Sequence, residues 1–341
     1  MMTKPLDIER ADALLAYLRS SGHIRFDEEP AICVLAGGVS NRTVLVERPE
    51  VGEAWVVKQA LPKLRVAVDW FSDPERIHRE ALGLRWLSEL APPGTITPLV
   101  FEDRDNHLLA MEAVPKPHEN WKTMLLGGRL EKDYVEQFGR LLGTVHRGGY
   151  ERREESESAF GDRSFFESLR LEPYYGYTAE QVPDAADFLR ALVEETRARR
   201  DTLVHGDYSP KNILVREGRL VLLDHKVIHF GEPAFDLGFS LTHFLSKAHH
   251  LRDMREDFAD AARFYWATYR EVVEELPWAV DIEQRAVRHT LGCLLARVAG
   301  RSPLEYLDES ERARQREAVL PLLPYPPGSV AGLVEGFVGK L

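Results

Sequence analysis

The chain has 341 residues, of which 44% are hydrophobic, and its formal net charge is −11. This length allows about two domains with substantial cores, and the acidic balance argues against a nucleic-acid partner, because a surface that follows phosphates needs clustered lysine and arginine. Its two cysteines, Cys33 and Cys293, stand far apart and argue against a disulfide framework. Since the chain has neither an apolar leader nor a run of about 18 apolar residues, we expect a soluble, cytoplasmic protein with no membrane partner.

The first hundred residues predict one helix and several strands. Apolar residues at helical spacing predict a helix over residues 6–18. Two β-rich runs, 31–35 and 43–46, flank a glycine-containing turn and predict a hairpin. A third β-rich run, 54–58, ends on Lys58. Glycine lets backbone amides approach an anion closely, although the same residues also make ordinary hairpin turns, and a lysine at a strand end is by default solvated.

A helix is predicted after Asp73-Pro74, because proline is favoured in the first helical turn. Glu80 lies beside the apolar stripe of this helix, so it is the acidic residue of the helix that is best placed to be buried. Glu75 and Glu89 are rival candidates, and a solvated salt bridge to Arg76 is the plain alternative for Glu80. Two more strands, 97–101 and 107–112, then lead to a proline-marked exit from the first domain.

The central stretch combines a hairpin with polar groups at both of its outer ends. Two apolar runs, one ending at Val215 and one at Leu223, are separated by a turn that contains Gly218. Asp207 and Asn212 precede this hairpin and Asp224 follows it. Carboxylate and amide oxygens suit Mg²⁺, and a carboxylate outside the metal shell can accept a hydroxyl proton. This arrangement favours metal-assisted phosphoryl transfer.

The spacing H-G-D-x-x-x-x-N, from His205 to Asn212, resembles the catalytic loop of the aminoglycoside phosphotransferase and choline kinase family of small-molecule kinases. These kinases belong to the protein-kinase-like superfamily. The resemblance implies that Asp207 is the catalytic base, that Asn212 and Asp224 bind Mg²⁺, and that His205 and Asp236 support the loop. The plain alternative is that H-G-D forms a turn and that Asp224 caps another element.

The same resemblance implies ATP as the phosphoryl donor and assigns nucleotide contacts in the first domain. Backbone amides of the hairpin turn would approach the phosphates, Lys58 would contact them through its ammonium group, and Glu80 would pair with Lys58. Backbone groups near residue 112 would pair with adenine. The implied nucleotide-binding residues are Gly37, Gly38, Ser40, Asn41, Lys58, Glu80, Met111, Glu112 and Val114.

Residues toward the C-terminus offer weaker candidates for an acceptor pocket. Tyr174, Tyr175 and Tyr177 could line such a pocket or serve as ordinary packing. Arg297 and Arg301 could reach a substrate or provide the usual positive charge at a helix end. Lys226 stands where family members commonly have an acidic residue, so it either supplies charge near the metal or points to solvent.

We therefore expect an α+β, protein-kinase-like fold with two lobes. Residues 1–112 would form a nucleotide-binding lobe with an antiparallel sheet and a helix, and residues 113–341 would form a mainly helical catalytic and substrate-binding lobe. The expected activity is transfer of the γ-phosphoryl group of ATP to a hydroxyl of a small polar molecule. An aminoglycoside or amino sugar is the first acceptor considered; methylthioribose, another sugar or an amino alcohol are alternatives. A nucleotide-binding scaffold without turnover is the alternative of another class, and the oligomeric state is left open.

Overall fold

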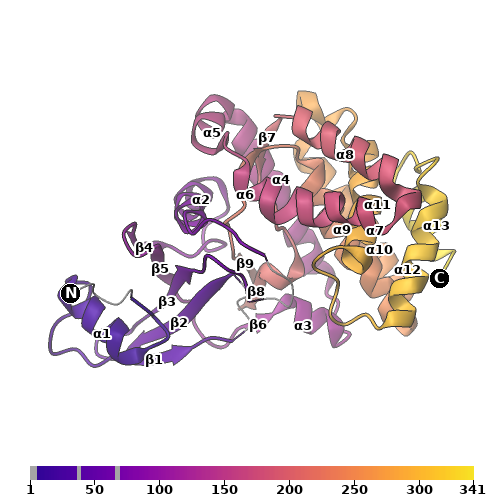
Figure 1. Ribbon diagram of the computed structural model, residues 1–341. Coiled ribbons are helices and arrows are strands. Elements are labelled where there is room, and N and C mark those ends of the chain that lie inside the picture. Colours follow the sequence, from indigo (N-terminus) through magenta and orange to yellow (C-terminus); the bar gives the residue numbers. More distant parts are fainter. Residues whose placement is uncertain (1–5, 37–39, 66–69) are drawn as a thin grey trace.

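The computed structural model describes residues 6–36, 40–65 and 70–341. The N-terminal third forms a sheet with few helices, and the remainder is dominated by helices (Figure 1). The N-terminal part lies at one end of the molecule and helices α12 and α13 lie at the other (Figure 1). None of the described helices is long and apolar enough to cross a membrane.

The N-terminal sheet has five antiparallel strands in the order β1-β2-β3-β5-β4. The expected hairpin forms, with Val34 opposite Val44. Helix α1 (Ala11–Ser20) buries Leu14 and Leu18 against apolar residues of the sheet. The strands are β1 (Ala31–Val34), β2 (Asn41–Arg48), β3 (Glu53–Ala60), β4 (Leu99–Asp103) and β5 (Leu108–Glu112).

Helix α2 (Arg76–Leu90) links the sheet to the helical part of the molecule. Its buried residues recur every three or four positions and include Ile77, Ala81 and Leu84, which is the pattern of an amphipathic helix. Gly83 allows a close approach to the segment after β9, because a Cβ there would lie 2.8 Å from Cβ of His225. The helix thus contacts both regions from which the candidate site is built.

The C-terminal region packs around α9 (Ala234–His250), which is buried along almost its whole length. Other helices surround it, and its buried residues include polar ones such as Asp236 and Lys247 as well as apolar ones. The other helices of this region are α3 (Trp121–Leu126), α4 (Lys132–Glu151), α5 (Arg153–Phe160), α6 (Ser164–Phe166), α7 (Tyr177–Gln181), α8 (Ala186–Ala198), α10 (Arg255–Val273), α11 (Ile282–Ala299), α12 (Glu309–Val319) and α13 (Val330–Val338).

Short strands support the loops of the helical region. Strands β8 (Ile213–Arg216) and β9 (Arg219–Leu222) form the predicted central hairpin, and β6 (Glu119–Asn120) pairs with β8. Strands β7 (Thr202–Val204) and β10 (His229–Gly231) form a separate antiparallel pair. The central hairpin and the β7–β10 pair therefore flank the segment from His205 to Asn212.

Candidate active site

A cavity of about 280 Å³ lies where the sheet, the central hairpin and helices α9 and α11 come together. The sheet contributes residues of β2 and β3, and the helical region contributes the opposite wall. Six basic and two acidic side chains of the described residues line it: Lys58, Arg170, Lys211, Lys226, Arg297 and Arg301, with Asp207 and Asp224. The two central carboxylates that were predicted to converge thus face the same cavity.

Asp236, near the start of α9, holds the backbone before Asp207. Its two carboxylate oxygens accept hydrogen bonds from the N–H groups of His205 (2.7 Å) and Gly206 (2.8 Å). His146 contacts the same carboxylate at 3.2 Å. Burial opposes the charge of Asp236, but His146 and His205 outweigh this effect and lower its pKa. A charged carboxylate that accepts backbone N–H groups is a strong loop anchor.

Backbone conformation explains why glycine stands before Asp207. Gly206 has a φ of 77°, which L side chains rarely adopt. A Cβ at this position would also lie 2.9 Å from the carbonyl oxygen of Val227. His205 is turned inward, where its Nδ1 accepts the N–H of Asp207 (3.2 Å) and its Nε2 donates to Nδ1 of His225 (3.1 Å). The residues around Asp207 are therefore fixed by local contacts.

Asp207 forms an ion pair with Arg170, which comes from the π-helix η1 (Glu167–Gly176). Nη2 of Arg170 lies 2.6 Å from Oδ2 of Asp207, and Nε donates to the carbonyl oxygen of Gly206 at 2.9 Å. Burial disfavours the charge of Arg170, but Asp207, Tyr174 and Asp224 raise its pKa, so it stays positive. Among the described residues, Oδ1 of Asp207 has no hydrogen-bond donor.

Asp224 lies directly after the central hairpin and has a φ of 68°, an unusual value for a residue with a side chain. Both of its carboxylate oxygens lie 2.5 Å from Nζ of Lys226. Burial opposes the charge of Asp224, but Lys226 and Lys58 lower its pKa well below the usual range. Lys226 therefore points to the carboxylate and away from bulk solvent.

Asn212 is brought next to Asp224 by backbone pairing, since its carbonyl oxygen accepts the N–H of Leu223 at 2.9 Å. The side-chain Nδ2 of Asn212 donates to the carbonyl oxygen of Asp207, also at 2.9 Å. This bond leaves the side-chain oxygen as the remaining ligand atom, with no donor among the described residues. Backbone pairing thus places Asn212 beside the residue that precedes Asp224, and the side-chain oxygens of Asn212 and Asp224 are of the hard type that fits a Mg²⁺ ion.

Lys58 and Glu80 meet between strand β3 and helix α2. Nζ of Lys58 lies 2.5 Å from Oε1 of Glu80, and the glutamate is fully buried. Burial disfavours the charge of Lys58, but Glu80 and Asp224 outweigh it and raise the pKa of the lysine. Neither Glu75 nor Glu89 occupies this place, because Glu75 contacts His107 and Glu89 contacts Arg152.

The turn between β1 and β2 lies partly outside the described residues, and Gly37 and Gly38 belong to this part. Ser40 and Asn41, which follow them, line the cavity. Buried Arg76 of α2 donates to the backbone carbonyl groups of Ser40 and Leu61, and this fixes the end of the turn against the helix.

Val114 lies at the exit from strand β5, and among the described residues neither its N–H nor its C=O has a hydrogen-bond partner. The N–H of Glu112, in contrast, donates to Pro98 (2.9 Å), and Met111 is buried in the core. Backbone pairing with a ligand is therefore open at Val114, whereas the N–H of Glu112 is already used.

Two of the three tyrosines proposed for the acceptor pocket do not reach it. Tyr175 is fully buried, and its hydroxyl contacts His289 at 2.9 Å, so it is a core residue. Tyr177 packs under the guanidinium of Arg301 at 4.9 Å and does not line the cavity. Tyr174 lines the cavity and contacts Nη1 of Arg297 at 3.0 Å.

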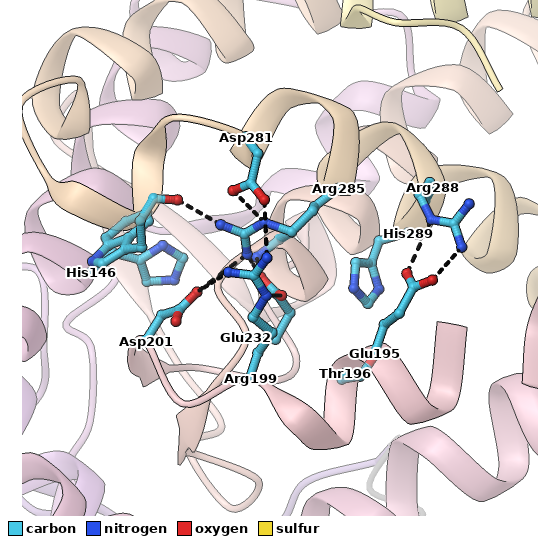
Figure 2. A network of polar contacts seen from close by, with 12 residues as sticks. His146, Glu195, Thr196, Arg199, Asp201, Glu232, Asp281, Arg285, Arg288 and His289 are labelled. Carbon is cyan, nitrogen blue, oxygen red and sulfur yellow. Dashed lines mark hydrogen bonds and ion pairs between the residues drawn. The ribbon is translucent and has the colours of Figure 1, made fainter. Parts of the chain in front are cut away.

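A network of ion pairs lies behind the loop anchor, centred on Arg285 of α11 (Figure 2). Arg285 contacts Asp281 at 2.9 Å, Asp201 at 3.3 Å and Glu232. Arg199 adds a second contact to Asp281 at 3.0 Å. Because Glu232 lies four residues before Asp236, this network fixes the start of α9 relative to α11.

Sequence reasoning missed Arg170 and gave no role to Lys211. Arg170 lies far from the central stretch in sequence and reaches Asp207 because a π-helix places residues 170 and 174 on one face. Such helices are rare and occur often at functional sites. Lys211, in contrast, stands between Asp207 and Asn212, so its position inside the motif was an available signal.

Similarity to solved structures defines the fold of the chain. The chain resembles the macrolide 2′-phosphotransferase of Brachybacterium faecium, with a TM-score of 0.52 and 17% identity, over 93% of this chain and 99% of that one. It also resembles an ethanolamine kinase of Plasmodium vivax, with a TM-score of 0.56 and 11% identity, over 98% of this chain and 91% of that one. The fold is the protein-kinase-like α+β fold with two lobes, as predicted.

The chain belongs to the phosphotransferase enzyme family, whose model matches residues 31–272. Among curated proteins, it is 24% identical to methylthioribose kinase of Pectobacterium atrosepticum over 250 residues, which are 61% of this chain and 62% of that protein. The methylthioribose kinase of Citrobacter koseri is 25% identical over the same shares. The matched region thus spans less than two thirds of these relatives.

Proposed function

We propose that the protein transfers the γ-phosphoryl group of ATP to a hydroxyl group of a small molecule. The observation that carries this proposal is the presence of Asp207 and Asp224 in one cavity with the Lys58–Glu80 pair at its rim. Family membership supports the same reaction class. The lobe boundary is proposed between residues 112 and 113, where strand β5 ends.

The nucleotide would bind against the N-terminal sheet. Lys58 carries a permanent positive charge for the phosphates, and Glu80 holds the ammonium group in place. The turn that contains Gly37, Gly38, Ser40 and Asn41 would cover the phosphates with backbone N–H groups. Adenine would pair with the open backbone groups of Val114, beside Met111 and Glu112.

Asn212 and Asp224 are proposed to hold Mg²⁺, which takes one or two carboxylates from a protein and keeps several waters. When bound, the ion would neutralise charge on the phosphate oxygens during transfer. The ammonium group of Lys226 contacts both carboxylate oxygens of Asp224 in the structure. It would therefore have to move away or share these oxygens with the metal ion. The lysine thus tunes how strongly this carboxylate attracts a cation.

Asp207 is proposed as the group that orients the acceptor hydroxyl and takes its proton. Arg170 holds Oδ2 of Asp207, which leaves Oδ1 for the hydroxyl. In the reaction, a bond forms between the hydroxyl oxygen and the γ-phosphorus, the bond from that phosphorus to the β,γ-bridging oxygen breaks, and ADP leaves. His205 and Asp236 keep the loop in the required geometry.

An ADP-release screen tests the proposal, with amino sugars, aminoglycosides, methylthioribose, sugars and amino alcohols as acceptors. We expect ADP release with at least one small hydroxyl compound, and loss of that release in Asp207→Asn. A parent protein that binds ATP but phosphorylates no acceptor would favour a nucleotide-binding scaffold. Phosphate transfer that is unchanged in Asp207→Asn would remove Asp207 from the mechanism.

A further inference from the structure

One wall of the cavity carries positive charge that no carboxylate of the described residues neutralises. Arg297 of α11 and Lys211 line this wall, together with His243 of α9. The hydrogen bonds of Arg297 all leave from Nη1 and reach Tyr174 and Ser302. Within residues 6–36, 40–65 and 70–341, neither Arg297 nor Lys211 forms an ion pair with a carboxylate. Their charges are therefore free for a ligand.

Further lysines lie behind this wall. Lys247, one turn after His243 on α9, is fully buried, and its Nζ donates only to the carbonyl oxygen of His243, at 3.2 Å, among the described partners. Lys122 contacts Glu305, whose side chain is 65% exposed. Both ammonium groups also lie within 6 Å of the ring centroid of Tyr306 (5.5 and 5.8 Å). The positive charge therefore extends below the surface of the cavity.

These cations are close enough to repel one another. Burial, together with the charges of Lys122 and Arg297, lowers the pKa of Lys247 to about 7. Burial also lowers the pKa of Lys122 to about 8, helped by Lys211 and Arg297. A buried charge without a partner is costly, and each neighbour of the same sign adds to the cost. An anion bound in the cavity would remove this penalty.

We propose that this wall, formed by Lys211, His243 and Arg297 with Lys247 and Lys122 behind it, binds an anionic group of the acceptor. The acceptor is accordingly a hydroxyl compound that also carries a phosphate or a carboxylate. Guanidinium groups bind both anions through paired N–H donors. This inference rests on the proposed kinase function and specifies the acceptor of the same site.

The phosphates of the nucleotide do not account for these charges. Lys58 stands on strand β3 of the sheet and Lys226 follows the central hairpin, so the nucleotide side of the cavity has its own cations. Arg297 comes from α11 in the opposite, helical part, and its neighbour in the wall, His243 of α9, is a neutral imidazole because burial lowers its pKa. A polycationic aminoglycoside would add positive charge beside this wall and would be repelled. The wall therefore favours an anionic acceptor over a cationic one.

The first experiment compares acceptors that differ in charge, with release of ADP as the readout. Ribose 5-phosphate and glycerol 3-phosphate form the phosphate arm, gluconate and glycerate form the carboxylate arm, and ribose, glycerol, choline and kanamycin are the neutral and cationic counterparts. We expect turnover in one of the anionic arms and at least tenfold lower kcat/KM for its uncharged counterpart. Turnover of a neutral or cationic compound with equal or greater efficiency would overturn the inference and leave the kinase function standing.

The second experiment measures binding of the same anionic compounds by calorimetry and does not depend on turnover. Because a hydrogen bond to a charged group contributes about 1.5–3 kcal/mol, Arg297→Gln should weaken binding roughly 10- to 100-fold. Lys211→Gln should act in the same direction. Arg288→Gln is the control, because Arg288 pairs with Glu195 outside the cavity, and it should bind like the parent.

The two experiments separate failure of the inference from failure of the proposed function. Anion binding that depends on Arg297 and Lys211, without any ADP release, would support the anion site and contradict the kinase function. Absence of anion binding to the parent, or equal binding to the parent and both variants, would contradict the anion site whatever the kinase assay shows.

Discussion

Two groups of buried charges in the helical part of the molecule are built in opposite ways. In the network behind the loop anchor, Arg285 and Arg199 meet Asp201, Glu232 and Asp281, so each cation has a carboxylate within 4 Å. Around the cavity wall, Arg297, which lines the cavity, and Lys247, which lies behind the wall, have none among the described residues. Charges with a structural role are paired with opposite charges of the same chain, whereas the charges proposed to bind a ligand are not.

Helix α11 carries both arrangements, with Arg285 near its start and Arg297 near its end. The residue type is the same, and only the neighbours differ. The overall charge of −11 gives no hint of a basic cavity. The comparison shows that the role of a buried arginine is decided by which elements pack against it.

The largest expected effect on stability comes from breaking the compensated network. Arg285→Met leaves Glu232, Asp201 and Asp281 without their main partner, and removing one partner of a buried ion pair costs about 3–5 kcal/mol. Chemical denaturation should therefore show a large loss of unfolding free energy. Arg288→Met is the matched control on the same helix, because its pair with Glu195 is partly exposed and should contribute about 0–1 kcal/mol. Similar losses in both variants would contradict the difference drawn between them.

Replacing an uncompensated cation behind the cavity wall should have the opposite effect on stability. Lys247→Met removes a buried cation whose pKa is lowered to about 7, and one unit of pKa shift corresponds to about 1.4 kcal/mol. We expect the variant to be more stable than the parent by about 1–3 kcal/mol at pH 7. Reduced stability would show that Lys247 is a structural residue.

The pH dependence of this stabilisation gives a check on its cause. Between about pH 7 and the unfolded pKa near 10.5, the unfolded parent binds one more proton at Lys247 than the folded parent, so the stability of the parent rises with pH. The stability of Lys247→Met lacks this rise. The difference in unfolding free energy between the variant and the parent should therefore become smaller from pH 7 to pH 9. A constant difference would assign the stabilisation to packing.

A second prediction on pH dependence concerns Glu232, which belongs to the compensated network. Burial raises the pKa of Glu232 to about 7, although Arg285 and the N–H of Ala234 act against this. Because the folded state holds this proton more tightly than the unfolded state, the contribution of Glu232 to stability is greatest below about pH 4.5 and is lost as the pH rises to 7. The stability of Glu232→Gln should therefore change less than that of the parent between about pH 4.5 and pH 7. Glu195→Gln, in an exposed pair, should leave the profile unchanged.

The smallest expected effect concerns Lys226, the cation that contacts Asp224. Lys226→Met removes a competitor for the carboxylate oxygens, so we expect half-maximal activity at a Mg²⁺ concentration several-fold lower than in the parent. Lys226→Arg is the conservative control and should keep the parent titration. An identical Mg²⁺ titration for the methionine variant would show that the lysine does not affect the metal.

Much of the fold could be predicted because its signals are local. The strand pattern around residues 31–60, the helix after Pro74 and the central hairpin all follow from periodicity and turn residues. The H-G-D motif is a local signal too, and it indicated Asp207 as a site residue, which lines the cavity. The ion pair of Arg170 with Asp207 joins distant segments through an irregular π-helix, and nothing in the sequence marks that contact. Tyr175 and Tyr174 are adjacent, and only packing decides which one reaches the cavity.

The most direct test of the account is ATP affinity measured by calorimetry, with and without Mg²⁺, for Asp207→Asn and Asp224→Asn. Asp207 is proposed to act on the acceptor hydroxyl alone, so its variant should bind Mg·ATP like the parent while turnover falls about 10²–10⁴-fold. Asp224 is proposed to bind the metal, so its variant should lose the Mg²⁺-dependent part of ATP affinity together with turnover. If both variants bind Mg·ATP like the parent and turn over normally, the assignment of this cavity as a phosphotransferase site is wrong.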